Sequence, residues 1–170
     1  MRSPCLWISH APVDDEGLAP LLQAQDAVRM LKLSSTSTTD QTLLRIGQFE
    51  DLSTLGLDET KITDAGLLRL VLLQKLSHLS LADTAVSDAG VPSLAKLQNL
   101  FSLDLSGTKV SDDGIQGLAA LPRLRFLGVR NTRVTEAGRA ALRDALPLLT
   151  FEEEAVPPPK FKLPTPKSGK

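Results

Sequence analysis

Aliphatic residues return along the chain at a fixed interval of 24 residues, which divides it into similar units. Each unit opens with two leucine-type positions placed two residues apart. The first column of these positions contains Leu31, Leu55, Leu79, Leu103 and Leu127. The second column contains Leu33, Leu57, Leu81, Leu105 and Val129. Because residues two apart on a strand point to the same side, each pair predicts a short strand with one buried face.

Leucines spaced three apart follow each strand and indicate a helix. Two of these stripes contain Leu67, Leu70, Leu73, Leu94, Leu97 and Leu100. A hydroxyl residue followed by an acid precedes the helices at Thr63, Ser87, Ser111 and Thr135. These pairs predict helix starts, because the hydroxyl can accept from the first free N–H groups and the acid suits the helix dipole. Each unit is therefore predicted to contain a strand, a loop and a helix.

Two further columns of small or polar residues have predicted packing roles. A threonine recurs at Thr36, Thr60, Thr84, Thr108 and Thr132. We expect its hydroxyl to hydrogen-bond loop backbone in the adjacent unit, which would satisfy buried polar groups along the stack. A glycine recurs at Gly66, Gly90, Gly114 and Gly138. We expect it to let the backbone of the neighbouring unit approach closely.

The repeat also predicts the limits of the domain. We expect one domain over residues 1–156, built from a partial first unit (5–27), full units (28–147) and a terminal cap (148–156). The composition then changes abruptly, because residues 157–170 contain proline and lysine and no acid. Such a segment is expected to be an extended, disordered tail.

The consensus L-x-x-L-x-L-x-x-T-x-[IV]-[ST]-D-x-G, which covers about residues 5–151, resembles the leucine-rich-repeat superfamily. It is similar to repeats of the F-box and cysteine-containing type and to those of bacterial leucine-rich-repeat proteins. The resemblance implies an α/β solenoid, with a curved parallel sheet on the concave face and helices on the convex face. It is specific for the fold and not for a function, because one scaffold serves unrelated partners.

Composition and charge narrow the classes of function. The 42% of hydrophobic residues can form a core, and a net charge of −1 supplies no general attraction for nucleic acid or an anionic membrane. With one cysteine, Cys5, and two histidines, His10 and His78, the chain lacks ligands for a structural zinc site, and we expect no cofactor or metal. The sequence shows no signal peptide and no membrane-spanning run, so we expect a soluble, cytoplasmic protein.

The outward residues of the strands are the predicted binding surface, because solenoids usually bind partners on the concave sheet. Aromatic and arginine residues dominate interface energies. The candidate partner-binding residues are Trp7, Met30, Asp58, His78, Asp104, Phe126 and Arg130. Acidic residues outnumber basic ones on this face, which favours a somewhat basic protein partner. The alternative is that the apolar members only cover small neighbours or the ends of the stack.

The favoured function is a non-catalytic protein-interaction module or adaptor, or a recognition subunit of a larger complex. The alternative is an assembly subunit, or a shortened form of a larger repeat protein, that uses its N-terminal end, where no polar cap is visible. A hydrolase would need His78, Ser80 and Asp104 to meet on the concave face. No catalytic motif interrupts the repeat, so we expect no enzyme activity. Thr165, which precedes Pro166, is a candidate phosphosite in a tail that is either a docking peptide or a solubilising terminus.

Overall fold

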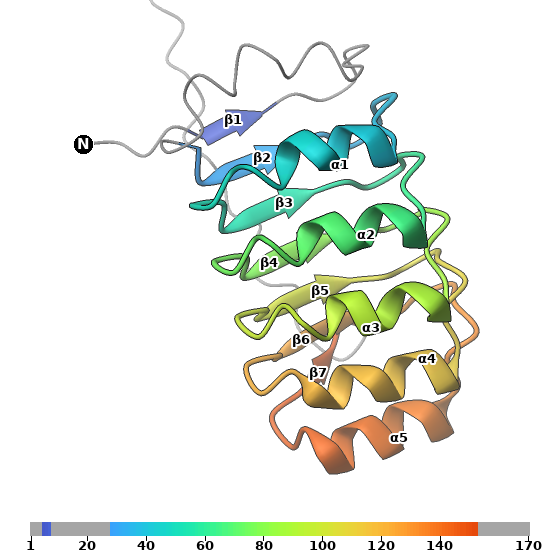
Figure 1. Cartoon of the computed structure of the whole chain (residues 1–170). Coiled ribbons are helices and arrows are strands. Elements are labelled where there is room, and N and C mark those ends of the chain that lie inside the picture. Colours follow the sequence, from blue (N-terminus) through green and yellow to red (C-terminus); the bar gives the residue numbers. More distant parts are fainter. Residues whose placement is uncertain (1–4, 8–27, 153–170) are drawn as a thin grey trace, which may run out of the picture.

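A seven-stranded parallel sheet forms one side of the molecule. The computed structural model describes residues 28–152 and the backbone of residues 5–7. Its strands are β1 (Cys5–Trp7), β2 (Met30–Lys32), β3 (Thr54–Gly56), β4 (His78–Ser80), β5 (Ser102–Asp104), β6 (Phe126–Gly128) and β7 (Thr150–Phe151). They follow one another across the sheet in chain order, so each unit adds one strand beside the last (Figure 1).

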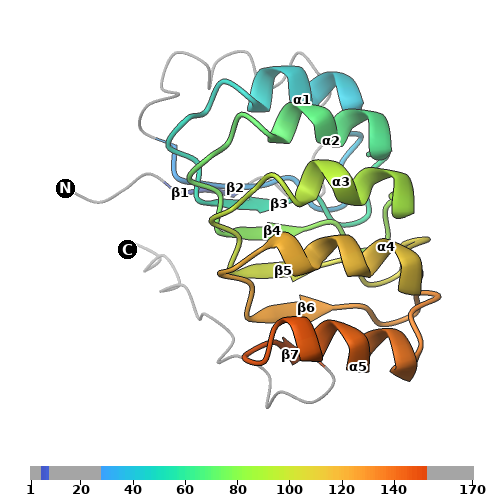
Figure 2. The ribbon, with the colours of Figure 1, turned by 60° about the horizontal axis from the view of Figure 1, so that its bottom comes forward.

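Helices cover the opposite side of the stack, in a separate layer from the strands (Figure 2). They are α1 (Asp40–Ile46), α2 (Asp64–Leu70), η2 (Asp88–Gly90), α3 (Val91–Leu94), α4 (Asp112–Gln116), η3 (Gly117–Ala120) and α5 (Glu136–Ala145). Neighbouring helices need about 8–10 Å between axes, whereas neighbouring strands need only about 4.8 Å. The helix side is therefore the wider, convex side, and the outward face of the sheet is concave.

The register of the strands agrees with the predicted columns. His78 pairs with Thr54 on one side and with Ser102 on the other, without a slip. The inward leucines of the strands and the leucines of the helices form one continuous hydrophobic core. Leu103, for example, has no exposed surface. The predicted α/β solenoid is therefore confirmed.

The C-terminal end of the described core is built from an aromatic side chain and two arginines. Phe151 of β7 is completely buried. The guanidinium groups of Arg139 and Arg143, from α5, lie 5.5 and 5.0 Å from the centre of its ring. These partly buried cations lie over the ring of the last described core residue and cover it.

The repeated glycines make room for an aspartate side chain of the preceding unit. The prediction that they make room for the backbone of the neighbouring unit was therefore wrong. A Cβ atom on Gly114 would lie 2.0 Å from Oδ1 of Asp88, one unit earlier. That carboxylate accepts from the backbone N–H of Ser111 at 2.7 Å and from its hydroxyl at 2.6 Å. The same arrangement links each unit to the next at Asp40–Thr63, Asp64–Ser87 and Asp112–Thr135.

This aspartate contact also fixes the helix starts. The hydroxyl of Thr63 donates to Asp40 and accepts from the N–H of Ala65 at 3.3 Å, so one side chain joins two units and caps a helix. Helix capping by the hydroxyl is confirmed at Thr63, Ser87 and Thr135, but Ser111 makes no capping bond. Hydrogen bonds from Thr135 lower the pKa of the Asp112 carboxyl below its ordinary value.

The repeated threonines bond within their own unit, so the predicted bond to the adjacent unit was wrong. The hydroxyl of Thr108 donates to the carbonyl of Leu105 at 2.6 Å, and Thr60 bonds Leu57 in the same way. The loop doubles back on itself at this point, which brings the hydroxyl to a carbonyl three residues earlier. The threonine column therefore stabilises each turn separately.

The turn that ends each strand is left-handed. The residues with positive φ are Ser35, Glu59, Asp83, Gly107 and Asn131. Their φ angles lie between 54° and 70°, a conformation that favours Gly, Asn and Asp. This column lies three positions after the last residue of each strand and turns the chain toward the helix layer.

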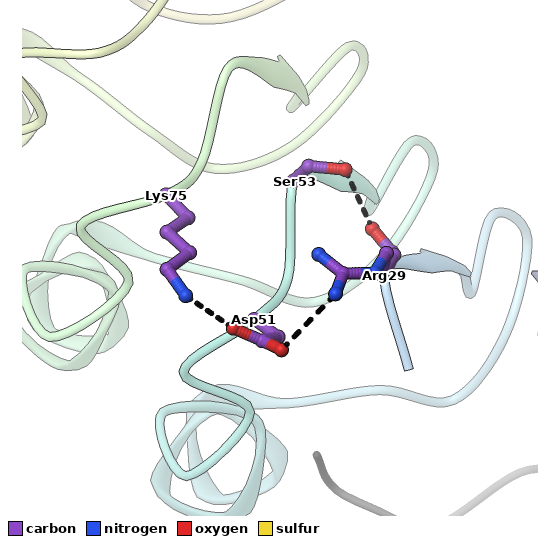
Figure 3. Close-up of polar contacts among 4 residues, drawn as sticks. All are labelled: Arg29, Asp51, Ser53 and Lys75. Carbon is purple, nitrogen blue, oxygen red and sulfur yellow. Dashed lines mark hydrogen bonds and ion pairs between the residues drawn. The ribbon is translucent and has the colours of Figure 1, made fainter. Parts of the chain in front are cut away.

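A ladder of polar contacts joins the loops that lead into the strands (Figure 3). The Asp51 carboxylate contacts the Lys75 ammonium and, at 3.4 Å, the Arg29 guanidinium. A hydrogen bond from Lys75 and its charge lower the pKa of Asp51. Beside this pair, the hydroxyl of Ser53 donates to the carbonyl of Arg29 at 2.9 Å. Two units further along, Arg123 continues the ladder by donating to Asn99 at 3.0 Å.

The predicted domain limits fall largely outside the described residues. Of the partial first unit only the backbone of β1 is described, and it pairs in parallel with β2. The end of the cap and the tail over 157–170 lie outside the described part. Within the described part, no helix is long and apolar enough to cross a membrane.

Candidate binding face

The concave face contains most of the predicted partner-binding residues, but they do not form one cluster. Met30 lies on β2, two strands away from His78 on β4. Phe126 lies on β6, in the same column as both. Asp58 follows β3, and its carboxylate already accepts from the hydroxyls of Ser34, at 2.6 Å, and Ser80. The side chain of Trp7 and the whole of Thr165 lie outside the described residues.

Three rings from successive units contact one another at the start of β4, β5 and β6. The Phe101 ring centre lies 5.9 Å from that of His78 and 5.3 Å from that of Phe126. The Phe101 and Phe126 rings meet edge to face, which is a favourable geometry for aromatic pairs. We call His78, Phe101 and Phe126 the aromatic row. It joins one imidazole and two phenyl rings of three successive units.

Phe101 was missed from the sequence, although a signal for it existed. The two preceding units have serine in its column, Ser53 and Ser77, and each serine hydroxyl donates to the carbonyl one unit earlier. Phe101 breaks this ladder and leaves 41% of its surface exposed. Phe101 replaces the serine hydrogen bond by contacts between rings of neighbouring units and stays partly exposed to solvent. A departure from a chain's own repeat is a sign of function.

Two acids lie beside the aromatic row, on either side of Gly128. A Cβ atom on Gly128 would lie 2.3 Å from Oδ1 of Asp104, so the Asp104 carboxylate occupies the space left by the glycine. Partial burial, followed by repulsion from Asp104, raises the pKa of Glu152 above its ordinary value, and Arg130 opposes this shift. We call Asp104 and Glu152 the acidic pair. Its two carboxylates are close enough to repel each other.

Arg130 lies next to the acidic pair and offsets part of its charge. Its guanidinium donates to the carbonyl of Glu152 at 3.3 Å, and its backbone N–H donates to Ser106 at 3.2 Å. The side chain itself is exposed.

His78, Ser80 and Asp104 are each engaged in a separate hydrogen bond. Nδ1 of His78 lies 2.8 Å from the hydroxyl of Ser77. The hydroxyl of Ser80 donates to Asp58, and Oδ1 of Asp104 accepts from the N–H of Ser106 at 2.9 Å. The arrangement is not a nucleophile–base–acid relay. Within residues 28–152, no group of three or more His, Cys, Asp or Glu side chains is arranged to hold a metal ion.

Partial withdrawal of the His78 ring from water has an electrostatic consequence. This desolvation lowers the pKa of His78 below its ordinary value of 6.5. The lowered pKa favours the neutral form of the ring at pH 7. The negative charge of the acidic pair is not cancelled by a histidinium ion.

Comparisons with known proteins agree with this architecture. A family model for the leucine-rich repeat matches residues 96–119. An internalin of Listeria monocytogenes is similar in structure, at 18% identity and a TM-score of 0.55, over 79% of this chain and 43% of that one. Internalin C2 of the same organism shares 23% identity at a TM-score of 0.62, over 79% and 65% of the two chains. No curated protein is significantly similar in sequence.

A leucine-rich-repeat protein of Leptospira interrogans has the same fold, at 18% identity and a TM-score of 0.56, over 82% of this chain and 33% of that one. The chain thus spans between one third and two thirds of the length of these three structures. At such identities the likeness shows the fold and not a shared partner. The matched repeat, the repeated columns and the similar structures together show that this chain has a leucine-rich-repeat fold.

Proposed function

We propose that this chain is a non-catalytic adaptor that binds a basic segment of a protein partner on its concave face. Leucine-rich-repeat domains generally mediate protein–protein interaction, and their concave sheets are the usual contact surface. The observation that carries the proposal is the aromatic row beside the acidic pair. The single cysteine supports a reducing, cytoplasmic setting for this adaptor.

The two parts of the site suit the two parts of a lysine or arginine side chain. On a strand, residues two apart on the same face are separated by roughly 7 Å, which is the spacing from the Phe126 column to the Gly128 column. The apolar stem of a cation can therefore lie on Phe101 and Phe126 while its charged head reaches Asp104 and Glu152. Aromatic rings also attract a cation directly when it lies over their faces.

A selection from a random peptide library on the immobilised full chain tests this proposal. We expect the selected peptides to be rich in lysine or arginine together with aromatic residues. Their affinity should fall at least about tenfold in Phe101→Ser and in Asp104→Ser, because loss of a buried interface contact costs about 1.4 kcal/mol or more. Both substitutions introduce residues that this chain already has in the same columns, at Ser77 and Ser80.

Leu68→Gln is the matched control for these variants. Leu68 is 60% exposed on α2, on the opposite side of the molecule, and Gln116 occupies its column two units later. This variant should bind the selected peptides as the original chain does. Peptides without cationic residues, or peptides that bind the two face variants unchanged, would contradict the proposal.

Assembly through the N-terminal edge is the second candidate, and the place of β1 at the edge of the described sheet favours it. An edge strand can pair with a strand of another chain. Light scattering of the full chain over a hundredfold concentration range tests this use. A mass equal to that of one chain at every concentration would exclude self-assembly.

A further inference from the structure

We propose that residues 157–170 of this chain dock on its own concave face and compete there with the partner. The inference rests on the proposed function of that face, and it identifies a regulator of the same site. Three observations carry it: where the described chain ends, how far the remaining residues can reach, and which charges they have.

The described chain ends on the concave face itself. β7 is the last strand of the sheet, and Glu152 follows it directly. The Glu152 side chain lies close enough to Asp104 and Arg130 for their charges to change its pKa. The next residues therefore start beside the acidic pair, without having to cross an edge of the molecule to reach it.

The length of the chain after Glu152 is sufficient to reach the aromatic row. Phe161 lies nine positions after Glu152, and proline occupies positions 157–159. At about 3.1 Å per residue an extended proline-type segment of this length spans about 28 Å. The distance from β7 to β4 is three strand spacings, or about 14 Å. Phe161 can thus reach any ring of the aromatic row and still leave enough chain for a reversal of direction.

The chemistry of the segment is complementary to the face. Its charged residues are Lys160, Lys162, Lys167 and Lys170, with no acid among them. Phe161 lies between two of these lysines, so the segment presents an aromatic ring flanked by cations. This is the same combination that the aromatic row and the acidic pair select in a partner. Asp58, Glu59 and Asp83 follow β3 and β4 and place further acids in the loops that leave the sheet.

Because the segment is covalently attached, even a low intrinsic affinity is sufficient for it to occupy the face. A short flexible linker holds a segment near its site at an effective concentration in the millimolar range. A segment with a dissociation constant of about 0.1 mM therefore occupies the face in most molecules and weakens a competing partner by about tenfold. A partner that binds the face tightly displaces the docked segment, whereas a partner that binds weakly does not.

Amide NMR spectra of the full chain and of a tail variant test the docking directly. The variant combines Lys160→Glu, Phe161→Ser and Lys162→Glu. We expect the signals of Ser102, Asp104 and Gly128 to move relative to the original chain, because the docked segment leaves them. A synthetic peptide of residues 157–170, added to this variant, should move them back. Added salt should have the same effect as the substitutions, since it screens the charge pairing.

A charge control separates docking from a general change of field. Lys61→Glu combined with Lys96→Glu alters two exposed lysines outside the face and should leave the three face signals in place. Identical face signals in the original chain and the tail variant would overturn the proposal. Signals that depend on protein concentration would also overturn it, because they would show docking on a second copy.

Peptides selected from the random library distinguish this inference from the function on which it rests. They should bind the tail variant about tenfold more tightly than the original chain. Equal binding to both proteins would remove the regulator and leave the binding function standing. Failure of all selections, including those on the tail variant, would remove the binding function even if the tail contacts the face.

Discussion

At the scale of single residues, the stack is joined by a small set of repeated side-chain contacts. Asp88 is typical, because its carboxylate accepts two hydrogen bonds from Ser111 and fills the space beside Gly114. Bonds to a charged acceptor are worth roughly twice those between neutral groups. The glycine is needed because any side chain there would displace the acceptor. Each of the three residue types in this contact therefore depends on the other two.

Gly114→Ala is expected to destabilise the protein by about 1–3 kcal/mol, because the new Cβ would displace the Asp88 carboxylate from its bonds. The same substitution should cost much less in a chain that already has Asp88→Ala, since the displaced carboxylate is then absent. Urea unfolding of the two single variants and the double variant measures this coupling. Gly56→Ala is the control, because its Cβ would have no neighbour closer than 3.4 Å. Additive effects of the two changes would contradict the contact.

At the scale of elements, the strands and helices are too short to be stable by themselves. The longest helix, α5, has 10 residues, and β5 has only three. Isolated helices below about 12 residues are marginal in water. Pro92 follows the first residue of α3, which fits its missing N–H at a helix start. Stability therefore comes from the contact of each unit with the next, as expected for a quasi-one-dimensional stack.

Leu103→Ala should lower the free energy of unfolding by about 2–5 kcal/mol, the usual cost of a cavity at a completely buried leucine. Leu68→Ala, at the exposed position of α2, should change it by no more than about 0.5 kcal/mol. Thermal or urea unfolding of both variants provides the comparison. A small loss at Leu103 would show that this column does not form the core.

At the scale of the whole molecule, the two faces have different chemistry. The convex side exposes leucines such as Leu68 and Leu72. The concave side brings together the aromatic row and the acidic pair from β4 to the end of β7. Because the net charge is only −1, the attraction that we propose for a basic partner must come from this local arrangement and not from the molecule as a whole.

Binding of a cationic peptide is expected to weaken as the pH falls from 7 toward 4.5. The raised pKa of Glu152 means that this acid loses its negative charge earlier than an ordinary glutamate. His78, whose pKa is below 6.5, gains a positive charge in the lower part of the same range. Protonation of Glu152 removes an attraction for the cation of the peptide, and protonation of His78 adds a repulsion. Fluorescence anisotropy at several pH values, with a labelled peptide from the library, measures the effect.

Glu152→Gln and His78→Thr should each flatten this pH profile, and the second introduces the residue found at Thr54 in the same column. In the control Leu68→Gln, the loss of peptide affinity at low pH should be the same as in the original chain. An affinity that is constant or rises as the pH falls would show that the acidic pair does not contact the bound cation.

Periodicity in the sequence was sufficient to determine the strands, their register and the inward and outward columns. A 24-residue repeat places equivalent atoms side by side, so the pairing of Leu55 with Leu79 follows from counting alone. Most helix starts could also be predicted, because a capping hydroxyl bonds to backbone N–H groups only a few residues away. Trp7, by contrast, stays a prediction, because its side chain lies outside the described residues.

Only the tertiary structure decided which side chains meet across the units. Counting could not show that Asp88 fills the space beside Gly114, that Thr108 bonds within its own unit, or that Phe101 joins His78 to Phe126. A column gives the position of a Cα atom, whereas these contacts depend on the direction of each side chain and on the distance between neighbouring units. The direction of a side chain is set by packing in three dimensions. Residues 24 apart in the chain come into contact only after the chain has folded.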